Sequence, residues 1–120
     1  MMGLDNYAAR LPGDIELSEE DQKAFQDANI ELCGGLFSGN DGSFRGKVYA
    51  SYVLEVTGES LYEPWLPPET LREMYDSMVA YQRTPEQDAD VMVPTAFEHG
   101  ELCKFFKVCF ERGLGLVGWY

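Results

Sequence analysis

The chain has 120 residues, with 21 acidic against nine basic side chains, so its formal net charge is -12. A hydrophobic fraction of 45% is ordinary for a globular domain and excludes disorder as the main state. No apolar run reaches the roughly 18 residues of a membrane-spanning helix and no signal peptide is visible, so we expect a cytoplasmic protein without a membrane role. The length predicts one domain over residues 1–120.

The excess negative charge is concentrated in two stretches. Residues 1–31 hold eight acids and two bases, and residues 55–90 hold nine acids and two bases. A field of this sign repels phosphate backbones, so we expect no direct binding of nucleic acid. It favours a basic partner protein, which an inhibitor or a nucleic-acid mimic would bind. The alternative is that the acidity serves only solubility or growth at high salt.

The first predicted helix follows Ser18, a good N-cap residue, and runs to about residue 28 with Phe25 as its main apolar contact. This helix is short and mostly polar, so we expect it on the surface. Acids fill its first turn, where they suit the helix dipole: Glu19, Glu20 and Asp21. The alternation of apolar and polar residues over 30–33 predicts a short strand.

A glycine-rich loop follows and leads into a stretch with helical periodicity. Apolar residues recur at four-residue intervals, at Phe44, Val48, Tyr52 and Val56. The predicted helix ends at Gly58, which suits the left-handed position after a helix. A strand is the rival assignment, because valine and tyrosine are mediocre helix formers.

The loop region 34–47 supports a second functional interpretation, a small-molecule or anion-binding protein. Backbone N–H groups at the predicted helix start would bind an anion together with Ser43, Arg45 and Lys47. The loop is not a Walker A motif, because Val48 stands where that motif needs Ser or Thr. The simpler interpretation is a connection whose glycines satisfy turn geometry.

Cys33 stands just before this loop and is the candidate reactive thiol of a weak enzyme. Its base would have to be His99, the sole histidine. The acidic field opposes a thiolate, so a buried structural cysteine is the favoured interpretation. We expect binding rather than catalysis, with no cofactor. We also predict no metal site, because a four-ligand zinc site would need His99 and all three cysteines.

The second half of the chain begins with a proline-rich crossing over 59–68, and Pro68 suits the first turn of a helix. Apolar residues at helical spacing follow: Leu71, Met74, Tyr75, Met78 and Val79. The polar face of this helix carries a second set of acids: Glu69, Glu73 and Asp76. Residues 83–90 are predicted as an exposed loop and residues 91–93 as a short strand.

The last predicted helix runs from about Thr95 to Arg112, and a glycine-punctuated strand follows to the end of the chain. Four aromatic residues are expected to close the core rather than to form an exposed patch: Tyr62, Trp65, Trp119 and Tyr120. The fold class is therefore α+β, a single compact domain with three to four helices packed on a small sheet that includes the C-terminal strand.

The leading functional hypothesis is a non-catalytic acidic protein that binds a basic partner protein. The residues predicted to steer and pair with that partner lie on two helices: Glu19, Glu20, Asp21, Glu69, Glu73 and Asp76. A further interpretation is that the chain is one subunit of a homo-oligomer with its aromatic segment at the contact.

Overall fold

The computed structural model describes residues 4–12, 17–33 and 41–119. In these residues three short strands form an antiparallel sheet in the order β2-β1-β3. They are β1 (Asp5–Ala9), β2 (Ser43–Phe44) and β3 (Gly115–Trp119). The α+β fold with the C-terminal strand in its sheet is confirmed.

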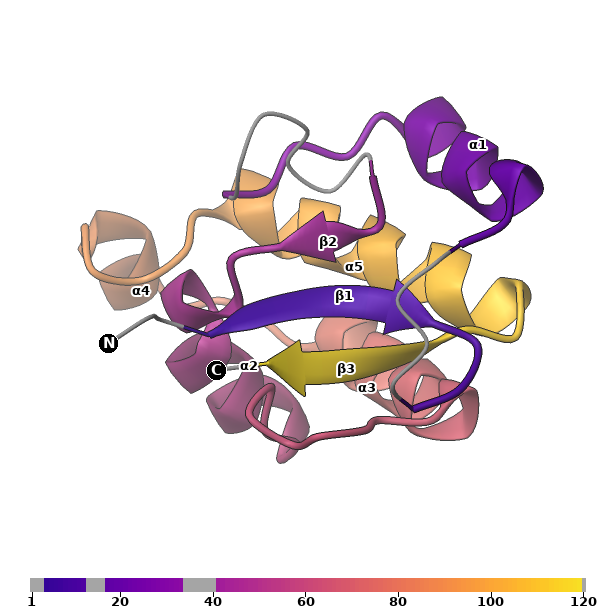
Figure 1. Ribbon diagram of the computed structural model, residues 1–120. Coiled ribbons are helices and arrows are strands. Elements are labelled where there is room, and N and C mark those ends of the chain that lie inside the picture. The colour runs from indigo at the N-terminus through magenta and orange to yellow at the C-terminus, as the bar shows by residue number, and fades with distance from the viewer. Residues whose placement is uncertain (1–3, 13–16, 34–40, 120) are drawn as a thin grey trace.

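Five α-helices in the described chain accompany the sheet: α1 (Glu19–Ala28), α2 (Ala50–Thr57), α3 (Pro68–Ala80), α4 (Pro85–Ala89) and α5 (Ala96–Glu111). A single 3-10 turn, η1 (Gly46–Val48), precedes α2. Figure 1 shows α5, α3 and α2 on one side of the sheet, α1 beside one end of α5, and α4 projecting near the other end. None of the helices in the described ranges is long and apolar enough to cross a membrane.

The helix termini follow the predicted signals. The Ser18 hydroxyl accepts a hydrogen bond from the Asp21 backbone N–H at 3.1 Å, and Thr95 forms a capping box with Glu98. Gly58 ends α2 in the left-handed conformation with φ of 79°. The predicted ends of α1, α2 and α5 are therefore confirmed at these residues.

The core lies between the sheet and α5. Phe105 on α5 is fully buried, and its ring centroid lies 4.9 Å from that of Phe25 and 4.8 Å from that of Phe44. These three aromatic rings join a helix at the edge of the fold, a strand and the central helix. The prediction that Phe25 is the apolar contact of α1 is confirmed.

Several predicted elements are wrong. Residues 30–33 form no strand, residues 91–93 form a turn, and the expected loop at 83–90 contains α4. The helix expected from Phe44 begins only at Ala50. The strand β1 was not predicted.

Two aromatic side chains that were expected in the core lie on the surface. Tyr62 is 42% exposed and Trp119 is 60% exposed. Trp65 is partly buried. Its indole packs so closely against Gly115 that a Cβ atom on that residue would overlap the ring. Tyr120 lies outside the described residues.

Asp21 is fully buried, contrary to the prediction that it lies with the exposed acids of α1. Its Oδ1 atom accepts hydrogen bonds from Arg10 Nη2 at 2.8 Å and from Arg112 Nε at 2.7 Å. Burial alone would raise the pKa of Asp21, but hydrogen bonds with Arg112 and Ser18 and the charge of Arg10 outweigh it and lower the pKa. Asp21 therefore joins three parts of the fold and presents no free charge to a partner.

Candidate functional site

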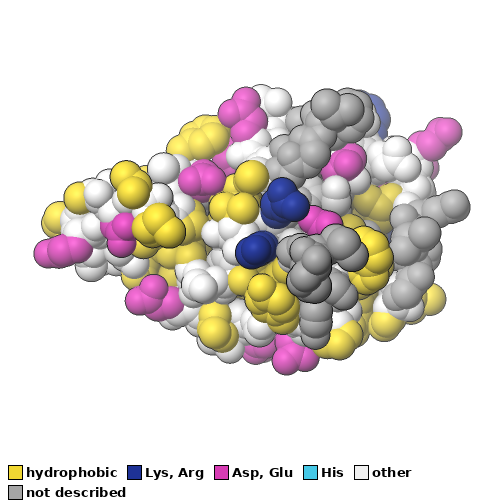
Figure 2. Space-filling view, turned by 60° about the vertical axis from the view of Figure 1, so that its left-hand side comes forward, with side chains coloured by type: hydrophobic (Ala, Val, Ile, Leu, Met, Phe, Trp, Pro, Cys, Tyr) yellow, Lys and Arg dark blue, Asp and Glu magenta, His cyan; other side chains and the backbone are white. Residues whose placement is uncertain are grey.

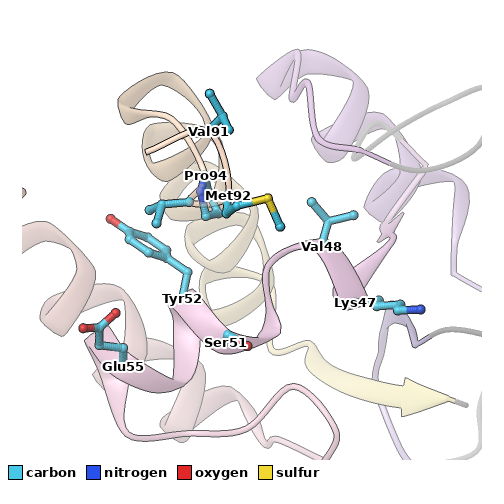
Figure 3. Close-up of a pocket in the computed structure, with 9 residues that line it drawn as sticks. Lys47, Val48, Ser51, Tyr52, Glu55, Val91, Met92 and Pro94 are labelled. Carbon is cyan, nitrogen blue, oxygen red and sulfur yellow. The ribbon is translucent and has the colours of Figure 1, made fainter. Parts of the chain in front are cut away.

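A groove of about 510 Å³ lies between the start of α2 and the segment that leads into α5. One wall is formed by η1 and α2, and the other by residues 91–94 (Figure 3). Its lining residues are Lys47, Val48, Ser51, Tyr52, Glu55, Val91, Met92, Val93 and Pro94. Six of these nine residues are exposed, so the groove is open to solvent along its length.

The first wall presents a helical spacing of side chains. Val48 and Tyr52 are four residues apart and form its apolar part, whereas Lys47 and Glu55 provide charges. Figure 3 shows Lys47 and Glu55 at opposite ends of this wall. The groove is therefore apolar in its middle and carries opposite charges at its two ends.

The second wall is a tight turn with two exposed apolar side chains at its tip. The Asp90 carboxylate accepts a hydrogen bond from the Met92 N–H at 2.8 Å, and the Asp90 carbonyl accepts one from the Val93 N–H at 3.2 Å. Val91 is 95% exposed and Met92 is 86% exposed. The turn thus holds two apolar residues in water where turns ordinarily place small or polar ones.

Two tyrosine hydroxyl groups tie the first wall to the start of α5. The Tyr49 hydroxyl donates to Glu98 Oε2 at 2.9 Å and accepts from the Cys33 N–H at 2.7 Å. Burial raises the pKa of Tyr49, and the neighbouring Glu98 carboxylate raises it further, so this hydroxyl keeps its proton. Glu98 also caps α5, so the junction of η1 and α2 is fixed to the end of α5 beside the groove.

The second link starts from Tyr52, whose ring lines the groove. Its hydroxyl lies 2.6 Å from His99 Nδ1 and accepts from Arg83 Nη1 at 2.8 Å. His99 Nε2 lies 2.7 Å from the Met78 carbonyl oxygen, and because a carbonyl can only accept, Nε2 donates. The other ring nitrogen, Nδ1, faces the Tyr52 hydroxyl. Arg83 also pairs with Asp88 at 2.9 Å, which connects the network to α4.

The anion site of the second interpretation has no free backbone N–H group at Ser43, Arg45 or Lys47. The Arg45 N–H donates to the Cys33 carbonyl at 2.7 Å, and the Lys47 N–H donates to the Leu4 carbonyl at 3.1 Å. The Ser43 N–H and hydroxyl both donate to Asp41 Oδ1. Of the three named residues, Arg45 and Lys47 keep exposed side chains that could meet an anion. The glycine-rich residues 34–40 lie outside the described residues.

The pair of thiol and imidazole that the enzyme alternative would need is not formed between Cys33 and His99. Cys33 is exposed, which contradicts the favoured interpretation of a buried cysteine. Both ring nitrogens of His99 are engaged, one by Tyr52 and the other by the Met78 carbonyl. Cys109, by contrast, is buried, and this burial raises the pKa of its thiol. Within the described residues, no group of three or more His, Cys, Asp and Glu side chains could hold a metal ion.

The other predicted partner-binding acids are all exposed: Glu19, Glu20, Glu69, Glu73 and Asp76. None of the ion pairs among the described residues involves them. In Figure 1 the helices that carry them, α1 and α3, lie on different sides of α5. The two acidic sets are therefore separate patches on the folded chain.

The groove itself was not predicted. Two features of the sequence carried a signal for it: an apolar pair, Val91 and Met92, directly after three alternating acids, and the four-residue spacing of Val48 and Tyr52. Both were assigned to ordinary secondary structure. The chain matches no protein-family model, and it matches neither a curated protein nor a solved structure.

Proposed function

We propose that this chain is a non-catalytic acidic protein that binds a basic partner protein. The observation that carries the proposal is the set of five exposed carboxylates on α1 and α3 that take part in no ion pair of the described chain. A formal net charge of -12 adds a long-range field that accelerates the approach of a positively charged surface. An inhibitor that occupies a nucleic-acid-binding surface is one form of this function.

We also propose that the protein works in a reducing compartment such as the cytoplasm. This proposal is supported by the three cysteines, Cys33, Cys103 and Cys109, none of which is paired in the structure. Association of identical chains is less favoured, because each copy would add the same negative field to the complex.

The experiment is affinity capture from the native host, followed by binding measurements with the captured partner. Two variants with the same net charge are compared. The test variant neutralises the two proposed patches, with the substitutions Glu19→Gln, Glu20→Gln, Glu69→Gln, Glu73→Gln and Asp76→Asn. The matched control neutralises five exposed acids elsewhere, with Asp5→Asn, Glu31→Gln, Glu63→Gln, Glu86→Gln and Glu111→Gln.

We expect the test variant to associate at least about tenfold more slowly than the control variant, and we expect wild-type affinity to fall steeply between low and high salt. Equal loss in both variants would show that net charge acts without a defined surface. A partner that binds equally well at low and high salt would contradict the proposal.

A further inference from the structure

We infer that the groove between α2 and residues 91–94 is the docking site for a segment of the basic partner, which inserts apolar side chains between Val48 and Met92. The inference rests on the proposed function, because the acidic patches bring the partner and the groove then holds it. Long-range charge sets the rate of approach, whereas a desolvated apolar contact sets the rate of departure.

The exposed apolar residues of the groove are the first argument. Met92 and Val91 lie almost fully in water at the tip of a hydrogen-bonded turn, and Val48 across the groove is 45% exposed. The Met92 thioether points across the groove toward Val48 (Figure 3). Three exposed apolar side chains that line the same groove mark it as a candidate site for another molecule. Methionine adapts its shape to the side chain that it meets.

The groove is also preorganised. The hydrogen bonds from Tyr49 to Glu98 and from Tyr52 to His99 join the α2 wall to the first turn of α5, close to Pro94. The turn that carries Met92 is fixed by Asp90. A docking surface held in this way loses little conformational freedom when a partner binds, so more of the contact energy remains as affinity.

The open shape favours a polypeptide over a small molecule. Sites for small ligands bury most of the ligand surface, whereas six of the nine residues lining this groove are exposed. A polypeptide covers such a groove from above and extends beyond both ends. Figure 2 shows hydrophobic and acidic side chains interspersed over this face, with basic side chains near its centre.

Charge then specifies the occupant and its direction. A second copy of the chain would bring a further net charge of -12, so a segment rich in Lys and Arg is the favoured occupant. Glu55 at one end of the groove suits a basic residue of the segment, and Lys47 at the other end suits an acidic one (Figure 3). The expected segment is therefore basic overall. It carries two apolar residues in its middle and one acidic residue at the end that lies next to Lys47.

The test is selection from a library of random 12-residue peptides displayed on phage, with the intact chain as the target. We expect enriched peptides to carry two apolar residues, an excess of Lys and Arg, and an acid at one end. Their affinity should fall at least about tenfold in Met92→Ser and in Val48→Ser. Leu54→Ser is the matched control, since Leu54 is a half-exposed residue of α2 that does not line the groove, and it should change affinity less than about twofold.

Charge reversal tests the direction. When the variant Lys47→Glu is the target, the selected peptides should carry a basic residue in place of the terminal acid. When Glu55→Lys is the target, they should carry an acid in place of the basic residue at the other end. Basic peptides that lack an apolar pair and bind Met92→Ser as well as wild type would overturn the docking site while supporting the proposed function. Apolar peptides without an excess of Lys and Arg would overturn the basic occupant and count against the proposed function. A failure to enrich any peptide would overturn the docking site.

Discussion

The two ends of α5 use charged residues in opposite ways. At its C-terminal end, Arg112 and Arg10 share the fully buried carboxylate of Asp21. These ion pairs hold β1, α1 and α5 together. At its N-terminal end lies the groove, where Lys47 and Glu55 are exposed and take part in no ion pair of the described chain.

The same contrast holds for apolar side chains. Phe105, in the middle of α5, is buried among aromatic rings, whereas Met92, four residues before α5 begins, is 86% exposed. The ion pairs of Asp21 and the ring of Phe105 are internal to the fold, whereas the side chains of the groove are left exposed. Substitutions at the two ends should therefore separate effects on stability from effects on binding.

The largest expected effect is that of Gly46→Ala, at the first residue of η1. A Cβ atom at Gly46 would overlap the Asn6 side-chain oxygen and would lie 2.9 Å from Leu4 Cδ2, and both neighbours are fully buried. We expect a loss of about 4 kcal/mol in the free energy of unfolding, measured by urea denaturation. Gly100 lies on an exposed face of α5, where an added Cβ atom would meet nothing within 4 Å beyond the neighbouring helix backbone, so Gly100→Ala should instead gain about 0.5–1 kcal/mol. Equal stability of the two variants would contradict the close approach at Gly46.

At the C-terminal end of α5, Asp21→Asn should destabilise the chain by about 2–3 kcal/mol, because it removes the buried charge that two guanidinium groups share. The loss should stay moderate, since Arg10 and Arg112 remain partly exposed and can be hydrated. Asp27→Asn is the control: its pair with Lys23 is exposed on both sides and should contribute less than about 0.5 kcal/mol. A similar loss in both variants would mean that the buried ion pairs of Asp21 stabilise the fold no more than an exposed pair does.

The pH dependence of the same variant gives a sharper test. The folded chain holds the pKa of Asp21 below the value of an unfolded aspartate, so the carboxylate stabilises the fold above the unfolded pKa of about 3.9. That contribution is lost as the pH falls through the folded pKa. The difference in unfolding free energy between wild type and Asp21→Asn should therefore be constant from pH 7 to 5 and shrink below about pH 4. A difference that persists unchanged in strong acid would refute this assignment.

The smallest expected effect is that of Met92→Ala, in the groove at the N-terminal end of α5. The side chain is nearly in water, so its removal should change the free energy of unfolding by less than about 0.5 kcal/mol. The same substitution at the fully buried Met78 should cost about 3 kcal/mol. A large loss at Met92 would show that this residue belongs to the core, and the contrast between the two ends would fail.

Local signals in the sequence predicted the helices well. Ser18, Pro68 and Thr95 mark the starts of α1, α3 and α5 within a residue, because capping depends on a few neighbouring atoms. The start of α4 carried a similar signal in Thr84 and Gln87, which form a capping box that the prediction of a loop overlooked.

Long-range partners explain the errors. Residues 30–33 alternate as a strand would, yet the Glu31 N–H is bound by the Glu101 carboxylate and the Cys33 N–H by the Tyr49 hydroxyl. Side chains from elsewhere in the fold replace the neighbouring strand. Strand β1 has no β-branched residue and forms because it pairs with β3.

The candidate site was predicted only in part. Five acids lie exposed as expected, but Asp21 is buried by arginines 11 and 91 residues away, which no local pattern reveals. The groove was missed because its two walls come from segments about 40 residues apart that the fold brings together.

The outer edge of β3 has a consequence for the behaviour of the protein at high concentration. Leu66, in the crossing before α3, exchanges two backbone hydrogen bonds of 2.8 Å with Leu116, so the chain covers its own last strand. At the opposite side of the described sheet, β2 contributes only two residues. Exposed edges are the templates on which strands from other molecules add and aggregates grow. Because both edges are blunted, the sheet gives little opportunity for such templated growth, and the exposed Trp119 can lie at the end of a strand without promoting it.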